Sequence, residues 1–268
     1  MSAMHDSAPH DQRRPHSTMA PAIEATGILK NFGSLEVLRG VSVALHRGEV
    51  TAIVGDNGAG KSTFMKMLSG EYIPDGGEIR VDGKPVQFRS THDAQAYGIE
   101  TVYQDLALAP DLTVPANVFL GRELKHGGWK GRLGILDRPS MLAESHEVLS
   151  SLGVRVKSYR AATNRLSGGQ RQGVAIARAL KWAQHAILMD EPTAALGARQ
   201  REMVYQAIRK AAERNLAVLL ISHDLPQVIE LADRIIVMRQ GRAVADLSPS
   251  AVTVRDVVDA MLGAKEAA

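Results

Sequence analysis

The strongest chemical signal in the sequence is a glycine-rich segment that matches the pattern G-x-x-x-x-G-K-[ST]. It follows an aliphatic stretch, Val50–Val54, that predicts a buried strand, and it opens a helix predicted over Lys61–Ser69. The glycines let backbone N–H groups turn toward phosphate oxygens, and Lys61 adds a full positive charge at the helix N-terminus. We expect a nucleotide-phosphate site, with the Ser62 hydroxyl as a Mg²⁺ ligand. The predicted binding residues are Gly55, Asp56, Asn57, Gly58, Ala59, Gly60, Lys61, Ser62 and Thr63.

A second signal is a pair of adjacent carboxylates, Asp190 and Glu191, at the end of the aliphatic run Ala186–Met189. A strand in a parallel sheet presents such residues at the edge where phosphates bind. Asp190 would then hold Mg²⁺, directly or through water, and Glu191 would polarise an attacking water. Asp-Glu pairs after strands also cap helices, but the phosphate motif in the same chain favours the catalytic interpretation.

A third segment precedes a predicted helix and reads Leu166, Ser167, Gly168, Gly169, Gln170. A hydroxyl group and glycine N–H groups at a helix N-terminus form a second anion site. One ATP carries a single set of β and γ phosphates, so two such sites in one chain favour a dimer.

With these three motifs the sequence resembles the ATP-binding subunits of ABC transporters, whose L-S-G-G-Q loop completes the ATP site of the opposite subunit. The resemblance covers nearly all of Ile23–Leu247. It implies an ATPase that uses ATP and Mg²⁺, pairs with a second copy of itself, and binds transmembrane permease subunits at the cytoplasmic face of the bacterial inner membrane. A periplasmic sugar-binding protein would be an indirect partner, with no nucleic acid and no direct membrane insertion.

Three further residues fall at family positions. The resemblance implies that Phe32 stacks on adenine, that Gln104 touches Mg²⁺ and responds to the membrane domain, and that His223 contacts the γ-phosphate. From the residues alone, Phe32 is also compatible with a core position and His223 with a polar loop. Gln104 and His223 join Lys61 and Glu191 in the predicted catalytic set.

Within the family, several segments resemble bacterial importers of simple sugars of the ribose, xylose and fructose type. They are Asp56-Asn57, Gly98–Leu106 and Phe119–Glu123. Gly197 stands where the family usually has an aspartate, which removes a hydrogen-bonding group between subunits; this departure is also familiar among those importers. We therefore expect a subunit that hydrolyses ATP to power import of a monosaccharide. The alternatives are an importer of another small solute, such as a branched-chain amino acid or a nucleoside, and a non-transport ABC ATPase.

The composition of the 268-residue chain argues against several other classes of protein. It has no cysteine, which excludes disulfides, zinc–thiolate sites and iron–sulfur clusters. A net charge of +3 and an aromatic content of 4% give little support for a nucleic-acid-binding surface. No apolar run approaches the ~18 residues of a membrane span.

Alternating aliphatic strands and helices predict an α/β fold. Together with the resemblance, they indicate an ABC-type P-loop NTPase with a RecA-like parallel-sheet core, an N-terminal antiparallel β region and an inserted α-helical subdomain at about 105–183. We expect one ATP-binding domain over 23–250, after a disordered tail over 1–22, and a C-terminal helix and tail over 251–268. The predicted strands are Ile23–Lys30, Val41–Leu45, Val50–Val54, Glu78–Val81, Val86–Phe88, Ala186–Met189, Ala217–Ile221, Arg234–Arg239 and Arg242–Asp246.

Overall fold

The structure is a computed structural model that describes residues 20–194 and 196–263. Most of the predicted N-terminal tail and the last five residues therefore lie outside the described residues. Ala22, at the predicted boundary, is fully buried, and its carbonyl oxygen accepts a hydrogen bond from the N–H of Asp82 at 3.1 Å.

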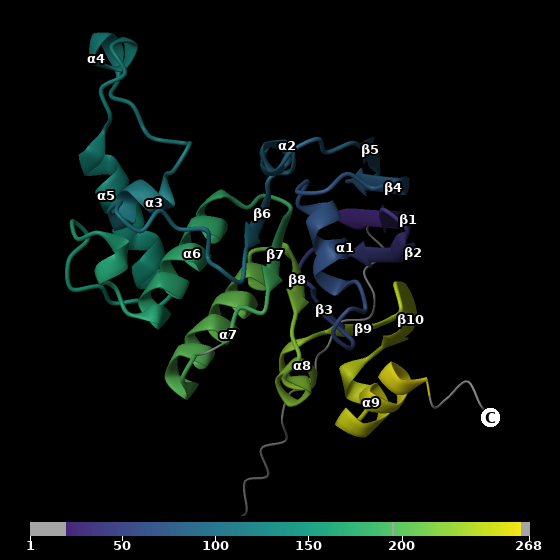
Figure 1. Cartoon of the computed structure of the whole chain (residues 1–268). Helices are drawn as coiled ribbons and strands as arrows, with labels where there is room; N and C mark the ends of the chain where they lie inside the picture. Colours follow the sequence, from purple (N-terminus) through teal and green to yellow (C-terminus); the bar gives the residue numbers. More distant parts are fainter. Residues whose placement is uncertain (1–19, 195, 264–268) are drawn as a thin grey trace, which may run out of the picture.

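The larger sheet has the order β10-β9-β3-β8-β7-β6 in the described part of the chain, with β10 antiparallel to β9 and the other pairs parallel (Figure 1). Every residue of β3, β7 and β8 is buried, as their continuous aliphatic sequences predict for strands covered on both faces. The strands are β3 (Val50–Val54), β6 (Ile99–Val102), β7 (Ala186–Asp190), β8 (Ala217–Ile221), β9 (Arg234–Arg239) and β10 (Arg242–Leu247).

The smaller sheet is antiparallel, with the order β2-β1-β4-β5. Its strands are β1 (Ile23–Phe32), β2 (Leu35–Leu45), β4 (Gly76–Val81) and β5 (Lys84–Val86). β1 and β2 are longer than predicted, because their exposed ends at Phe32 and Leu35 pair across a hairpin although they lack alternating apolar residues. Residues from both sheets share one apolar cluster with helix α1 (Lys61–Leu68), which buries Phe64, Met65, Met67 and Leu68.

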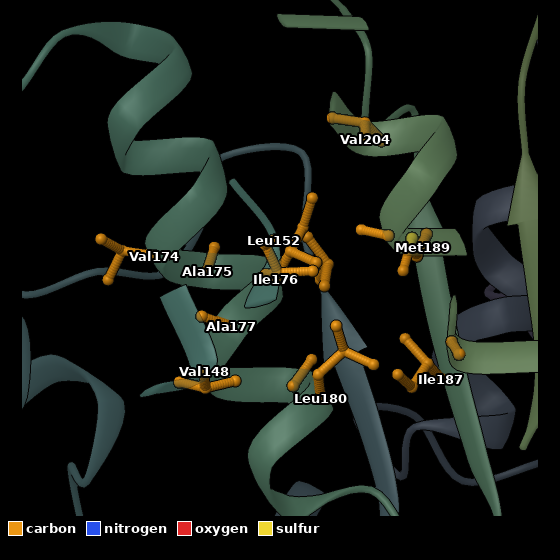
Figure 2. Close-up of a cluster of buried hydrophobic side chains, with 14 of the residues drawn as sticks. Val148, Leu152, Val174, Ala175, Ile176, Ala177, Leu180, Ile187, Met189 and Val204 are labelled. Carbon is orange, nitrogen blue, oxygen red and sulfur yellow. The ribbon is translucent and has the colours of Figure 1, made fainter. Parts of the chain in front are cut away.

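Between β6 and β7 the described chain is helical, with α3 (Val114–Val118), α4 (Gly128–Arg132), α5 (Arg138–Ser151), the short η1 (Thr163–Arg165) and α6 (Gly168–Trp182). Figure 2 shows side chains of α6, including Ile176 and Leu180, on the same cluster as Ile187 and Met189 of β7. Helix α6 therefore joins the helical part to the sheet through a common core.

The remaining elements are helices that lie outside the two sheets and the helical part between β6 and β7. They are α2 (Thr91–Ala96), α7 (Ala198–Glu213), α8 (Leu225–Leu231), η2 (Pro249–Ala251) and α9 (Val254–Leu262). The last helix is capped at its start, because Thr253 and Asp256 form a reciprocal capping box. None of the helices in the described ranges has the length and apolar character that crossing a bilayer requires.

The side chain of Asn117 stabilises the loop at residues 109–113, which leads into α3. This side chain is fully buried, and its Oδ1 accepts a hydrogen bond from the N–H of Ala109 at 2.8 Å. Its Nδ2 group donates to the carbonyl oxygens of Ala109 at 3.0 Å, Leu112 at 3.2 Å and Thr113 at 3.1 Å. One amide thus substitutes for the regular backbone pairing that this loop lacks.

We predict that Asn117→Ala lowers the free energy of unfolding by about 2–3 kcal/mol, because the partly buried N–H of Ala109 loses its acceptor. Urea denaturation followed by circular dichroism measures the change. The control is Asn164→Ala, whose exposed side chain donates only to Asp111 at 3.1 Å and should cost less than about 0.5 kcal/mol. Equal losses in the two variants would contradict a special role for Asn117.

Candidate functional site

The carboxyl ends of β3, β7 and β8 meet at one edge of the larger sheet. The strand register places both Ile53 of β3 and Asp190 of β7 opposite Ile221 of β8, so the three strands end at the same level. The phosphate loop follows β3, Glu191 follows β7, and His223 comes two residues after β8. Residues that lie far apart in the sequence are therefore brought to one edge.

The phosphate loop, residues 55–60, needs glycine for two physical reasons. Gly55, Gly58 and Gly60 have φ angles of +151°, +83° and +99°, a region that L side chains rarely adopt. A Cβ atom on Gly55 would also collide with the carbonyl oxygen of Met238 in β9. The loop is tied to the same hairpin by a hydrogen bond from the N–H of Gly241 to the carbonyl oxygen of Ala59 at 3.1 Å.

Lys61 begins α1, and its ammonium group turns back over the loop. Its Nζ donates to the carbonyl oxygens of Gly55 at 2.7 Å and Asp56 at 3.0 Å. Burial lowers the pKa of Lys61, and the negative charges of Glu191, Asp190 and Asp56 oppose that shift. A partly desolvated ammonium beside the first N–H groups of a helix is a strong site for phosphate oxygens.

Asp190 is the last residue of β7 and is buried. The Ser62 hydroxyl donates to its Oδ1 at 3.4 Å. Burial raises the pKa of Asp190, the Ser62 hydrogen bond lowers it, and the neighbouring Glu191 raises it further. Carboxylate and hydroxyl oxygens at this separation suit Mg²⁺, which is commonly bound by one or two protein oxygens together with phosphates and water. No group of three or more histidine or acidic side chains that could hold a metal ion occurs within the described residues.

Glu191 is held in an unusual backbone conformation, with a φ angle of +46°. Its N–H donates to the carbonyl oxygen of Ile221 at 3.0 Å, which extends the β7–β8 ladder by one residue. Its Oε2 lies 2.8 Å from Nδ1 of His223, whose side chain is 77% exposed. Two predicted catalytic residues are therefore in direct contact, with the imidazole open to an incoming ligand.

Gln104 lies in the turn after β6, next to the carboxyl end of β7, because Val102 pairs with Met189. Its side chain is exposed and makes no hydrogen bond to any residue that the structure describes. The chain just beyond it is fastened to α6, since Arg178 donates to the carbonyl oxygens of Leu106 at 3.1 Å and Ala107 at 2.7 Å.

A buried charge cluster supports this attachment. Oε1 of Glu100, in β6, lies 2.7 Å from a guanidinium nitrogen of Arg122. Burial raises the pKa of Glu100, while the positive charges of Arg122 and Arg178 lower it. Burial also lowers the pKa of Arg178, and Glu100 opposes that shift. β6, α6 and the chain after α3 are thus joined by complementary charges behind Gln104.

Phe32 ends β1, and its side chain is 42% exposed, so it is not a core residue. Its ring packs edge-on against Tyr72, with the ring centroids 5.3 Å apart, and Nζ of Lys30 lies 5.6 Å from the Phe32 centroid. The hairpin that carries Phe32 continues into β2, which packs Leu38 beside Gly60 of the phosphate loop. An exposed aromatic ring is therefore anchored to the sheet that flanks the loop.

The Leu166–Gln170 segment begins α6. Ser167 is the N-cap, and its hydroxyl accepts from the N–H of Gln170 at 3.3 Å while Oε1 of Gln170 accepts from the N–H of Ser167 at 3.0 Å. Gly168 faces open space. In the described part of the chain, no hydrogen bond or ion pair joins residues 167–170 to the phosphate loop, so one chain does not bring its two predicted anion sites together.

Three supporting residues were not predicted from the sequence. Arg178 had a usable signal, because it lies four residues after Val174 on the packed side of α6, where a charge needs a partner. Glu100 had a similar signal as an acid inside a short strand. Tyr72 had none, since only the fold brings it against Phe32.

Comparison with known proteins agrees with this geometry. Residues 38–194 match the family model described as ABC transporter. The fructose import ATP-binding protein FrcA of Rhizobium meliloti is 46% identical over 92% of this chain and 95% of that protein. The xylose/arabinose import ATP-binding protein XylG of Sulfolobus acidocaldarius is 41% identical over 91% and 94%. The ribose import ATP-binding protein RbsA 1 of Rubrobacter xylanophilus is 43% identical over 87% of this chain, which spans 45% of that longer protein.

Solved structures give the same result for the fold. A nucleotide-free ATP-binding cassette from an ABC transporter superposes with a TM-score of 0.74 at 26% identity, over 90% of this chain and 95% of that one. A dimeric bacterial ABC transporter cassette superposes with a TM-score of 0.72 at 25% identity, over 85% and 98%. The predicted fold class is confirmed. Because the family model matches more than half of the sequence and the relatives align over nearly all of it, the chain belongs to the ABC transporter family, as an ATP-binding cassette.

Proposed function

We propose that this cassette binds and hydrolyses ATP with Mg²⁺ to power the import of a monosaccharide. The observation that carries the proposal is the convergence of Lys61, Asp190, Glu191 and His223 at one sheet edge beside the phosphate loop. The cargo class is supported by the relatives named for fructose, xylose and arabinose, and ribose import. The cargo need not touch this chain, whose own substrate is ATP.

Hydrolysis in this site requires a general base, positive charge around the phosphates and a water molecule positioned for attack. The Glu191 carboxylate accepts a proton as the water oxygen bonds to the γ-phosphorus, and the bond from that phosphorus to the β–γ bridging oxygen breaks to leave ADP and phosphate. Lys61 and the loop N–H groups neutralise charge on the β and γ phosphates. His223, held by Glu191, donates to a γ-phosphate oxygen from the exposed side of its ring.

Mg²⁺ would be held by the Ser62 hydroxyl and by Asp190, with Gln104 reaching the site from the neighbouring strand. Held there, the ion would supply positive charge that offsets the negative charge of the phosphates. The 3.4 Å contact between Ser62 and Asp190 supports this assignment, because both oxygens already face one another. Phe32 would stack on the adenine ring, which its exposed face and its anchoring by Tyr72 favour.

Each ATP would lie between the phosphate loop of one subunit and residues 167–170 of a second copy. The open space in front of Gly168 and the lack of a bond between the two anion sites within one chain support this arrangement. The dimer would bind two permease subunits at the cytoplasmic face of the membrane, with a periplasmic sugar-binding protein delivering the cargo. Gln104 and the chain after it would report the permease state to α6 through Arg178.

We predict that Glu191→Gln retains ATP binding but lowers turnover by about 10²-fold or more, because the general base is lost while the phosphate contacts remain. Phosphate release and nucleotide binding are measured on the same preparations. Lys61→Ala provides the contrast: it should lose binding as well as turnover, since one charge and its hydrogen bonds to phosphate disappear together. Normal turnover in Glu191→Gln, or normal ATP binding in Lys61→Ala, would contradict the assigned roles.

The shared site predicts a disulfide between different chains. The sequence has no cysteine, so Asn57→Cys and Gly168→Cys can be made separately, each in the Glu191→Gln background, and then mixed. Both positions are open to solvent or to space, so neither change should disturb packing. ATP and Mg²⁺ should accelerate formation of a crosslinked dimer, as seen by non-reducing electrophoresis. Leu35→Cys, also exposed, replaces Asn57→Cys as the control, and equal crosslinking in the two mixtures would rule out the shared site.

The cargo class is tested on the assembled importer. The chain is purified with its permease subunits and binding protein, and ATP hydrolysis is measured with panels of monosaccharides, amino acids and nucleosides. We expect at least one monosaccharide to stimulate hydrolysis, and Glu191→Gln to abolish that stimulation. Stimulation by an amino acid or a nucleoside alone would overturn the cargo assignment while leaving the ATPase assignment intact.

A further inference from the structure

Residues 124–136, here called the tip, project from the helical part between α3 and α5. In Figure 1 helix α4, at the apex of the tip, lies at the opposite end of the molecule from α9. Two long coil segments join it to the rest of the helical part. The base of the tip, residues 125–126 and 135–136, is here called the neck. Its two sides are paired, since Lys125 and Leu136 form a β-bridge and the N–H of His126 donates to the carbonyl oxygen of Ile135 at 3.0 Å. The tip is therefore a defined projection.

The apex presents large apolar side chains to solvent. Trp129 is 67% exposed, Leu133 is 69% exposed and Ile135 is 42% exposed. Side chains exposed to this extent do not serve the core of this chain, and helix α4 itself has no buried residue. Apolar side chains gathered on one projection in this way commonly mark a surface for a partner or a membrane.

The charges of the tip have one sign. Lys125, Lys130 and Arg132 are exposed, and none of the three has an ion-pair partner in the part of the chain that the structure describes. His126 lies 3.9 Å from Asp137, at the base of the neck. The sequence of the tip contains no aspartate or glutamate. The projection thus combines unpaired cations with exposed aromatic and aliphatic groups.

We propose that the tip rests on the surface of a bilayer that contains anionic lipids, with Trp129 and Leu133 at the level of the headgroups. Tryptophan prefers that level, and lysine and arginine beside it bind lipid phosphates. The tip carries three exposed cations and no acidic side chain, so its charge complements that of an anionic lipid surface. The contact is peripheral and does not cross the bilayer. It rests on the proposed function only because a permease would hold this chain beside a membrane.

Vesicle binding tests the proposal on the full chain. Sedimentation should show tighter binding to vesicles of phosphatidylcholine mixed with phosphatidylglycerol than to phosphatidylcholine alone, and added salt should weaken it. Lys130→Ala with Arg132→Ala should weaken binding by about fivefold for each cation removed. Lys84→Ala with Arg242→Ala removes two exposed cations elsewhere and is the charge-matched control. Equal loss in the two double variants, or no preference for anionic vesicles, would overturn the proposal.

Tryptophan fluorescence gives a second readout that reports position. Trp129 is one of two tryptophans in the sequence, and the other, Trp182, is fixed by a hydrogen bond from its Nε1–H to the carbonyl oxygen of Val118 at 2.9 Å. Anionic vesicles should shift the emission to shorter wavelength, and Trp129→Phe should abolish the shift. An unchanged shift in Trp129→Phe would place the contact elsewhere and contradict the proposal.

Two further measurements separate this proposal from the proposed function. Trp129→Ser with Leu133→Ser should lose vesicle binding but keep the ATP hydrolysis of the free chain, since the tip is remote from the phosphate loop. Loss of permease binding in lipid-free detergent, with vesicle binding retained, would identify a protein partner instead and overturn the lipid contact. Vesicle binding by a preparation of the chain that hydrolyses no ATP would support the tip contact while removing the ATPase assignment.

Discussion

The parallel ladder that joins β3, β8 and β7 places Lys61, Asp190, Glu191 and His223 at one edge of the sheet. These strands are buried along their whole length, so each must satisfy its backbone groups against its neighbours, and a shift in register would leave buried N–H groups unpaired. That register brings Asp190 level with Ile221 and with the start of the phosphate loop. The charged groups are placed by backbone hydrogen bonds and do not need to attract one another into position.

The same ladder sets the electrostatics of the site. The elements around Lys61 and Asp190 partly shield both side chains from water. Burial lowers the pKa of Lys61 and raises the pKa of Asp190, so it favours the uncharged form of each. Their opposite charges, together with the Ser62 hydroxyl, offset part of that effect. In the proposed function, a nucleotide phosphate and a divalent cation would bring charges opposite in sign to those of Lys61 and Asp190.

The sequence predicted the site better than the parts that support it. The phosphate loop, the carboxylate pair and the capped start of α6 were predictable because each depends on residues adjacent in the chain. The β2 segment at Leu35 was not, because its pairing with Phe32 comes from the hairpin and not from an alternating pattern. The contact between Glu100 and Arg122 could not be predicted either. It joins a strand to a distant loop, and the sequence near one residue does not indicate the other as its partner.

Glu191 shows how the site trades stability for chemistry. A glutamate with a φ angle of +46° has a backbone strain of order 1 kcal/mol or more, which asparagine in the same place would relieve in part. The most favourable residue for the fold is therefore not the one that the proposed catalysis requires. In the proposed function, Glu191→Asn would therefore produce a cassette that is more stable but inactive, and that still binds the permease. Such a variant would inactivate the whole transporter although the cassette itself is correctly folded.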